Sequence, residues 1–112
     1  MKIAVSSTEK NIEGNVSDVF GRCPYFIIAE IKNKKIGKTE AIKNESTEQM
    51  SGAGISTAQL MAEKNIGAVI TRNVGPRALD VLKQFDIEIY SGKGVIKEAL
   101  QNFLKGKLEK IN

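Results

Sequence analysis

The sequence predicts a single α/β domain, with one mixed sheet of five strands and helices on its faces, in the order β-β-β-α-β-α-β-α. Short β-branched and aromatic runs are followed by segments in which apolar residues recur at helical spacing. A length of 112 residues fits one domain. The hydrophobic fraction of 41% and charged fraction of 27% are typical of a globular chain, and no apolar run is long enough for a membrane span.

Five segments are predicted to be strands because they are rich in β-branched or apolar residues and are bounded by turn signals. They are residues 2–6, 25–31, 35–42, 67–71 and 87–90. The second and third would form an antiparallel hairpin. Right-handed crossovers would make the first, third, fourth and fifth strands parallel, and the second strand antiparallel to them.

Three helices are expected, over residues 55–65, over residues 76–85 and after the Gly92-Lys93-Gly94 turn. Their predicted apolar faces consist of Ile55, Ala58 and Ala62; of Ala78, Val81, Leu82 and Phe85; and of Ile96, Ala99, Leu100, Phe103 and Leu104. The last six or seven residues are expected to fray. The predicted domain therefore covers residues 1–104, and residues 105–112 form a basic C-terminal tail.

Glycine-bearing loops lead into the first two helices. Ser51 precedes Gly52-Ala53-Gly54 and could cap the first helix, and Gly75 precedes Pro76, a residue favoured in the first helical position. The N-terminus of a helix offers free N–H donors and a partial positive charge, so each junction could hold an anion. Ordinary helix starts explain the same pattern equally well.

These loops should meet, because the carboxyl ends of parallel strands share one edge of the sheet, where ligands of open α/β sheets bind. The turn at Gly92 to Gly94 belongs to the same edge. The candidate ligand-binding residues at this edge are Ser6, Ser7, Phe20, Gly21, Arg22, Ser51, Gly52, Ala53, Gly54, Asn73 and Gly75.

Two neighbours in the loop before the second strand could carry chemistry. Arg22 could hold an anion by a forked contact. Cys23 could be a soft metal ligand once ionised, since an adjacent arginine and helix N-termini would lower its pKa. A small buried hydrophobic residue is the alternative interpretation of Cys23. Asn73 could face a ligand or only bond its own loop.

Several function classes are excluded or disfavoured. With one cysteine and no histidine, a single chain forms neither an internal disulfide nor a four-ligand Cys/His zinc site, and it lacks the base of a Ser-His-Asp system. The strand at 2–6 contains no acidic residue, so the paired carboxylates of a two-metal nuclease or of general acid–base catalysis are missing there. Gly52-Ala53-Gly54 is not followed by the lysine of a P-loop, which disfavours nucleotide hydrolysis. The net charge of +4 comes from scattered lysines without interleaved aromatic residues, which disfavours nucleic acid. We expect a binding protein rather than an enzyme, and a cytoplasmic one, because the N-terminus has no signal-peptide pattern.

Three motifs resemble those of the dinitrogenase iron–molybdenum cofactor biosynthesis domain proteins, small carriers related to nitrogenase accessory proteins. They are SDVFGRCPYF at 17–26, GAGISTAQL at 52–60 and VITRNVGPRA at 69–78. The resemblance covers roughly residues 1–104. It departs from the family at Val19 and at Gln49 to Ser51, where the family often has histidine, and at Arg72, where a small residue is common.

The resemblance implies a ribonuclease-H-like fold and a protein that binds or carries an iron–sulfur or iron–molybdenum cluster without catalysis. It implies partners that deliver or receive the cluster, and a homodimer is possible. The alternative is a binding module for a small anionic metabolite or nucleotide without metal. A third alternative is an interaction domain whose glycine loops are only structural.

Overall fold

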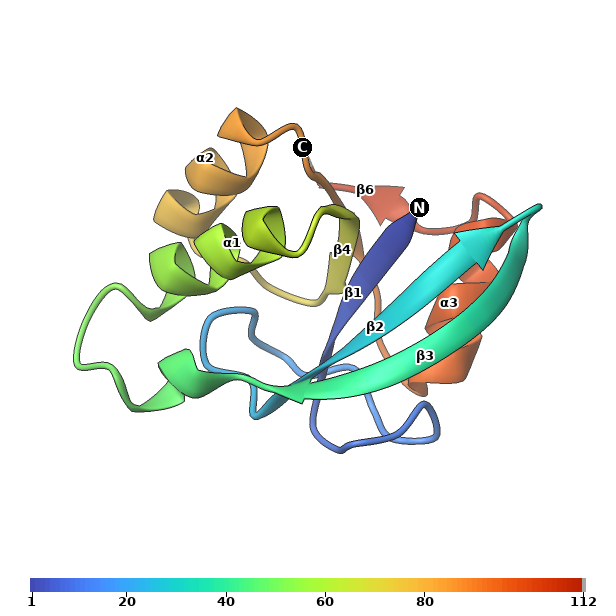
Figure 1. Ribbon diagram of the computed structural model, residues 1–112, viewed down its shortest axis with the longest axis horizontal. Coiled ribbons are helices and arrows are strands. Elements are labelled where there is room, and N and C mark those ends of the chain that lie inside the picture. The colour runs from blue at the N-terminus through green and yellow to red at the C-terminus, as the bar shows by residue number, and fades with distance from the viewer. Residues whose placement is uncertain (112) are drawn as a thin grey trace.

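The computed structural model describes residues 1–111 and contains one mixed sheet, in the strand order β3-β2-β1-β4-β5-β6 (Figure 1). The strands are β1 (Lys2–Ser7), β2 (Tyr25–Lys32), β3 (Lys35–Lys43), β4 (Ile66–Thr71), β5 (Glu88–Ser91) and β6 (Glu109–Lys110). β1, β4 and β5 are parallel, β2 is antiparallel to β1, and β3 is antiparallel to β2. The directions expected for the first five strands are therefore confirmed.

The helices cover both faces of the sheet. They are η1 (Glu45–Glu48, a 3-10 turn), α1 (Ala53–Glu63), α2 (Pro76–Gln84) and α3 (Ile96–Leu104). The helices α1 and α2 lie on one side of the sheet and α3 lies on the other (Figure 1). None of the helices in residues 1–111 has the length and apolar character needed to cross a membrane.

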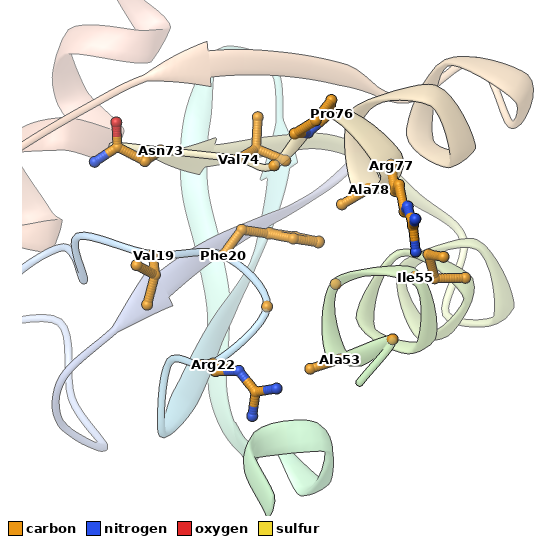
Figure 2. A pocket seen from close by; sticks show the side chains of 14 residues that line it. Val19, Phe20, Arg22, Ala53, Ile55, Asn73, Val74, Pro76, Arg77 and Ala78 are labelled. Carbon is orange, nitrogen blue, oxygen red and sulfur yellow. The ribbon is translucent and has the colours of Figure 1, made fainter. Parts of the chain in front are cut away.

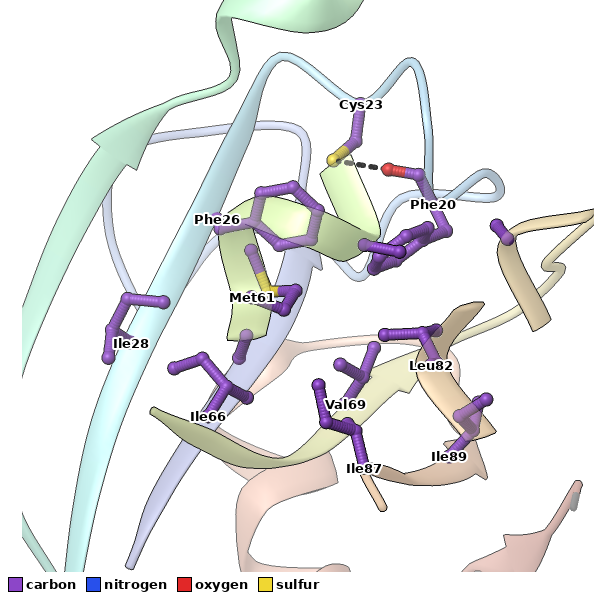
Figure 3. Close-up of a cluster of buried hydrophobic side chains, with 13 residues drawn as sticks. Phe20, Cys23, Phe26, Ile28, Met61, Ile66, Val69, Leu82, Ile87 and Ile89 are labelled. Carbon is purple, nitrogen blue, oxygen red and sulfur yellow. Dashed lines mark hydrogen bonds between the residues drawn. The ribbon is translucent and has the colours of Figure 1, made fainter. Parts of the chain in front are cut away.

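The alternation of side chains along β1 shows how this arrangement divides the core. Ala4 faces α1 and α2, whereas Ile3 and Val5 face α3, because successive residues of a strand point to opposite faces. On the α1/α2 side, Phe20 packs edge-on against Phe26, with 5.5 Å between the ring centroids. Figure 3 shows this cluster, in which side chains from the loop before β2 join those of the sheet and helices.

Two expectations, the number of strands and the fraying of the C-terminus, are wrong. The sheet has six strands rather than five, because Glu109–Lys110 folds back and pairs with β5 in antiparallel fashion. Ile111 continues this pairing by donating its N–H to the carbonyl of Ile89, at 2.7 Å. The expected fraying is therefore not seen at residues 109–111, and residue 112 lies outside the described residues. The division into a domain at 1–104 and a tail at 105–112 stays a prediction, as does the ribonuclease-H-like designation.

The predicted apolar faces of the first two helices also differ from the faces that are buried in the structure. The helix α1 begins at Ala53, and its buried residues are Ala53, Thr57, Ala58 and Met61, so only Ala58 of the expected face is fully buried. Thr57 is accommodated because its hydroxyl donates to the carbonyl of Ala53 at 2.8 Å. Phe85 follows the end of α2 and is 52% exposed.

Candidate functional site

A groove of about 600 Å³ lies at the carboxyl edge of the sheet, on the side of α1 and α2 (Figure 2). Three segments form it: the loop before β2, the start of α1, and the β4–α2 loop with the start of α2. The lining residues are Val19, Phe20, Gly21, Arg22, Gly52, Ala53, Gly54, Ile55, Asn73, Val74, Gly75, Pro76, Arg77 and Ala78. These three segments meet as expected, whereas the turn at Gly92 to Gly94 does not join them in the groove. The role of the three segments in binding stays a prediction.

Two glycines let the three segments approach. A Cβ on Gly21 would lie 2.8 Å from the Cα of Gly54, closer than real Cβ atoms come to backbone. Gly54 in turn faces Ala78, whose Cβ would lie 3.1 Å from a Cβ built at position 54. The loop before β2 therefore rests directly on the backbone of α1, and α1 rests on the first turn of α2.

Two helix N-termini open into the groove without a side-chain cap. The N-cap of α1 is Gly52, which has a left-handed φ of 74°, and the N-cap of α2 is Gly75. The expected cap by Ser51 is wrong, because Gly52 is the N-cap of α1 and no side chain makes a capping bond there. Neither helix has an acidic residue in its first turn. Within residues 1–111, the N–H groups of Ala53, Gly54 and Ile55 have no hydrogen-bond partner.

The N-terminus of α3 is different. The N–H of Ile96 donates to the carbonyl of Gly14, and the N–H of Lys97 donates to that of Ile12, both at 2.9 Å. Carbonyls of the same chain therefore take the N–H groups of the first two residues of α3, whereas within residues 1–111 the first N–H groups of α1 and α2 have no such partner. The N-termini of α1 and α2 thus offer the groove two positive dipole ends.

Two arginines flank the free N-terminus of α1. Arg22 and Arg77 point toward its first turn from two sides (Figure 2). The guanidinium of Arg22 donates to the carbonyl of Thr47 at 2.9 Å, and no carboxylate among the described side chains lines the groove. Neither arginine forms a salt bridge with any carboxylate that the structure describes. The groove therefore combines two cations with free amides, an arrangement suited to an anion.

The sequence analysis missed Arg77. It lies in the first turn of α2, where a cation is unfavourable beside the positive end of the helix dipole. That position, directly after Pro76, was the signal that could have identified it.

Several expected site residues lie elsewhere. Ser6 and Ser7 are fully buried, and the hydroxyl of Ser6 donates to Thr71 Oγ1 at 2.8 Å. These serines therefore stabilise the loops from below the edge of the sheet. Gly92 to Gly94 do not line the groove, and Ser51 is exposed outside it. Asn73 does line the groove, but its side-chain amide donates to the carbonyl of Asp18 at 3.0 Å, which ties it to the loop before β2 rather than to its own loop.

Cys23 is fully buried beneath the groove, and its thiol donates to the carbonyl of Phe20 at 3.3 Å (Figure 3). Burial raises the pKa of this thiol from 9.0 to about 11, since the charged form is poorly solvated, although hydrogen bonds partly offset the effect. The expected lowering of its pKa is therefore wrong. Within residues 1–111, no group of three or more His, Cys, Asp or Glu residues is placed to hold a metal ion.

The raised pKa of Cys23 gives a first prediction. Iodoacetamide at pH 8 should alkylate Cys23 in the native protein at least roughly a hundredfold more slowly than in the urea-unfolded chain, because the thiolate is scarcer and the sulfur is covered. Mass spectrometry of timed samples measures both rates. Equal rates would show that the thiol is open to solvent.

The same shift predicts a pH dependence of stability. The pKa of Cys23 is higher in the folded protein than in the unfolded chain. The contribution of the neutral, buried thiol to the free energy of unfolding is therefore complete below pH 9 and is lost as the pH rises toward 11. The free energy of unfolding should fall over this interval by about 2–3 kcal/mol more in the wild type than in Cys23→Ala. Parallel pH profiles for the two proteins would contradict the burial of the thiol.

The fold and the groove define a class: a small α/β domain with an open, basic groove at the carboxyl edge of its sheet. The chain belongs to the dinitrogenase iron-molybdenum cofactor family, whose sequence model matches residues 1–106. An uncharacterised protein of Methanocaldococcus jannaschii is 38% identical to it, over 99% of this chain and 96% of the relative.

Solved structures of similar fold share this architecture. The orange protein of Desulfovibrio gigas, in its apo form, is 29% identical with a TM-score of 0.88, over 97% of this chain and 91% of that one. A Thermotoga protein provisionally described as a NifB protein is 31% identical with a TM-score of 0.83, over 98% of this chain and 92% of that one.

Proposed function

We propose that this protein is a non-enzymatic carrier of an anionic iron–sulfur or iron–molybdenum cluster, or of a precursor, and that the cargo binds in the groove. The observation that carries the proposal is the pair of uncapped helix N-termini, which face a groove that Arg22 and Arg77 line and to which no described side chain brings a carboxylate. The family is named for the iron–molybdenum cofactor, which supports this chemical class of cargo.

The residues of the groove fit a cargo that brings its own ligands. They offer N–H donors, guanidinium groups and an apolar wall from Phe20, Ile55 and Val74. They offer neither thiolate nor imidazole, since the chain has no histidine and the sulfur of Cys23 lies beneath the groove rather than in its lining. Binding would therefore rest on charge and shape rather than on bonds from side chains to the metal.

A carrier of this kind needs proteins that deliver and receive the cluster, and we propose such proteins as its partners, with the cytoplasm as its location. A homodimer is compatible with this role. The basic groove suits a cargo that is passed on unchanged, which is why we propose no catalytic residue.

A second candidate is a binding module for a small anionic metabolite or nucleotide without metal. It is favoured by the same lack of metal-ligating side chains in the groove. The volume of about 600 Å³ falls in the range of small-molecule pockets.

Cluster retention tests the first proposal. Iron and sulfide, or a preformed cluster donor, are added anaerobically to the purified protein, and the visible spectrum is recorded after desalting. The wild type should keep the colour, and Arg22→Gln and Arg77→Gln should each weaken cluster binding about tenfold, since each removes a charge-assisted hydrogen bond.

The chain supplies matched controls. Arg72→Gln removes the third arginine, which lies outside the groove, and should retain the cluster like the wild type. Cys23→Ala should do so as well. Loss of colour in Cys23→Ala alone would make the thiol a ligand, against the proposed binding mode. Absence of colour in the wild type, with thermal stabilisation by phosphate compounds, would favour the metabolite-binding candidate.

A further inference from the structure

A second cleft of about 420 Å³ lies at the carboxyl ends of β4 and β5. It is formed where the chain leaves β4, by the β5–α3 turn, by one side of α3 and by the segment leading into β6. We call it the α3 cleft, and the residues that matter for its chemistry are Arg72, Ser91, Lys93, Asn102, Lys107 and Glu109. It exists because the C-terminal segment returns to the sheet, so the sequence analysis did not foresee it.

Positive charge from three separate segments converges on the α3 cleft. Arg72 comes from the end of β4, Lys93 from the turn after β5, and Lys107 from the segment after α3. Within the described residues, Lys93 and Lys107 form no salt bridge, and the cleft holds a single carboxylate, that of Glu109. Bringing like charges together is unfavourable unless an anion joins them.

Neutral hydrogen-bonding groups complete the lining. The side chains of Ser91 and Asn102 are half-buried in the cleft and make no hydrogen bond within residues 1–111. A hydroxyl and a carboxamide add donors beside the lysines. The first turn of α3 adds no donor to this lining, because none of residues 95–98 lines the cleft. The α3 cleft would thus bind through side chains, unlike the groove.

Arg72 lines the cleft, and its guanidinium contacts the carboxylate of Asp18 at 3.0 Å, with both side chains largely exposed. The next residue, Asn73, lines both the cleft and the groove. The two sites are therefore neighbours, separated by the β4–α2 loop.

We propose that the α3 cleft is a second binding site, which takes the phosphate group of a small phosphorylated metabolite or inorganic phosphate itself. A tetrahedral dianion with several acceptor oxygens matches cations arriving from three directions together with two neutral donor groups. A single carboxylate would use fewer of these donors. The proposal does not depend on a cluster in the groove.

An NMR titration tests it. Inorganic phosphate is added to ¹⁵N-labelled protein while sodium chloride holds the ionic strength constant. Saturable shifts should appear at the backbone amides of Gly92 and Lys93 and at the side-chain amide of Asn102. A parallel titration with glycerol phosphate separates the two sources of the ligand: tighter binding indicates a metabolite, and equal binding indicates phosphate alone.

The double variant Lys93→Gln/Lys107→Gln should weaken phosphate binding by roughly tenfold or more, because it removes two charged donors. The matched control, Lys35→Gln/Lys38→Gln, removes the same charge from exposed positions of β3 and should bind as the wild type does. Equal weakening in both double variants would reduce the effect to general charge screening. That result would overturn the proposal. So would chemical shift changes confined to Ala53–Ile55, or changes that never saturate.

Discussion

Phe20→Ala is expected to lower the free energy of unfolding by about 3–5 kcal/mol, the range measured for removal of a buried aromatic ring. Phe20 is 1% exposed, packs edge-on against Phe26, and belongs to the cluster shared by the sheet with α1 and α2. Its removal leaves a cavity that the surrounding β-branched side chains cannot fill without strain. Urea denaturation followed by circular dichroism gives the difference.

Phe85→Ala is the matched control, because that ring is 52% exposed beyond the end of α2. Its cost should stay below about 1 kcal/mol, as is usual for surface substitutions. Equal losses in the two variants would mean that Phe20 does not anchor the core. Phe20 also lines the groove, so its variant should bind a cluster poorly even at temperatures where it remains folded.

Gly21→Ala is expected to destabilise the protein by about 2–3 kcal/mol, in the range of overpacked positions. The added methyl would lie 2.8 Å from the Cα and 2.9 Å from the N of Gly54. Both atoms are backbone at the start of α1, so no side chain can rotate away. The loop before β2 would have to lift off the helix, which would also displace Arg22.

Gly75→Ala provides the comparison at the other N-cap of the groove. Nothing lies within 4 Å of a Cβ at position 75, and its φ of −67° suits any residue. Its cost should stay below about 1 kcal/mol, the scale of an N-cap change. Thermal unfolding of both variants measures the contrast. A Gly21→Ala protein as stable as Gly75→Ala would show that the loop and α1 are not in contact.

The first five strands and the three helices could be predicted because each has a clear pattern of apolar spacing or a clear boundary. The strand β6 could not, since Glu109–Lys110 has no apolar pattern and pairs only because α3 returns the chain to the edge of β5. The cap by Ser51 failed for a local reason: Gly52 takes the left-handed conformation and becomes the N-cap itself.

At the edge of the sheet, the topology alone indicated which loops meet. It could not indicate the direction of single side chains. Ser6 lies at that edge but turns its hydroxyl inward to Thr71, and Cys23 follows an exposed arginine yet lies wholly in the core. A free cysteine suits both a core and a metal site, so composition could not decide between them.

The uncapped N-termini of α1 and α2 also bear on the kinetics of binding. An anion that approaches the groove meets two helix N-termini and two guanidinium groups, so we expect long-range attraction to accelerate its association. The same attraction weakens as salt rises. A cargo held this way can leave without breaking a bond to the protein, and an acceptor with a more positive surface can draw it away.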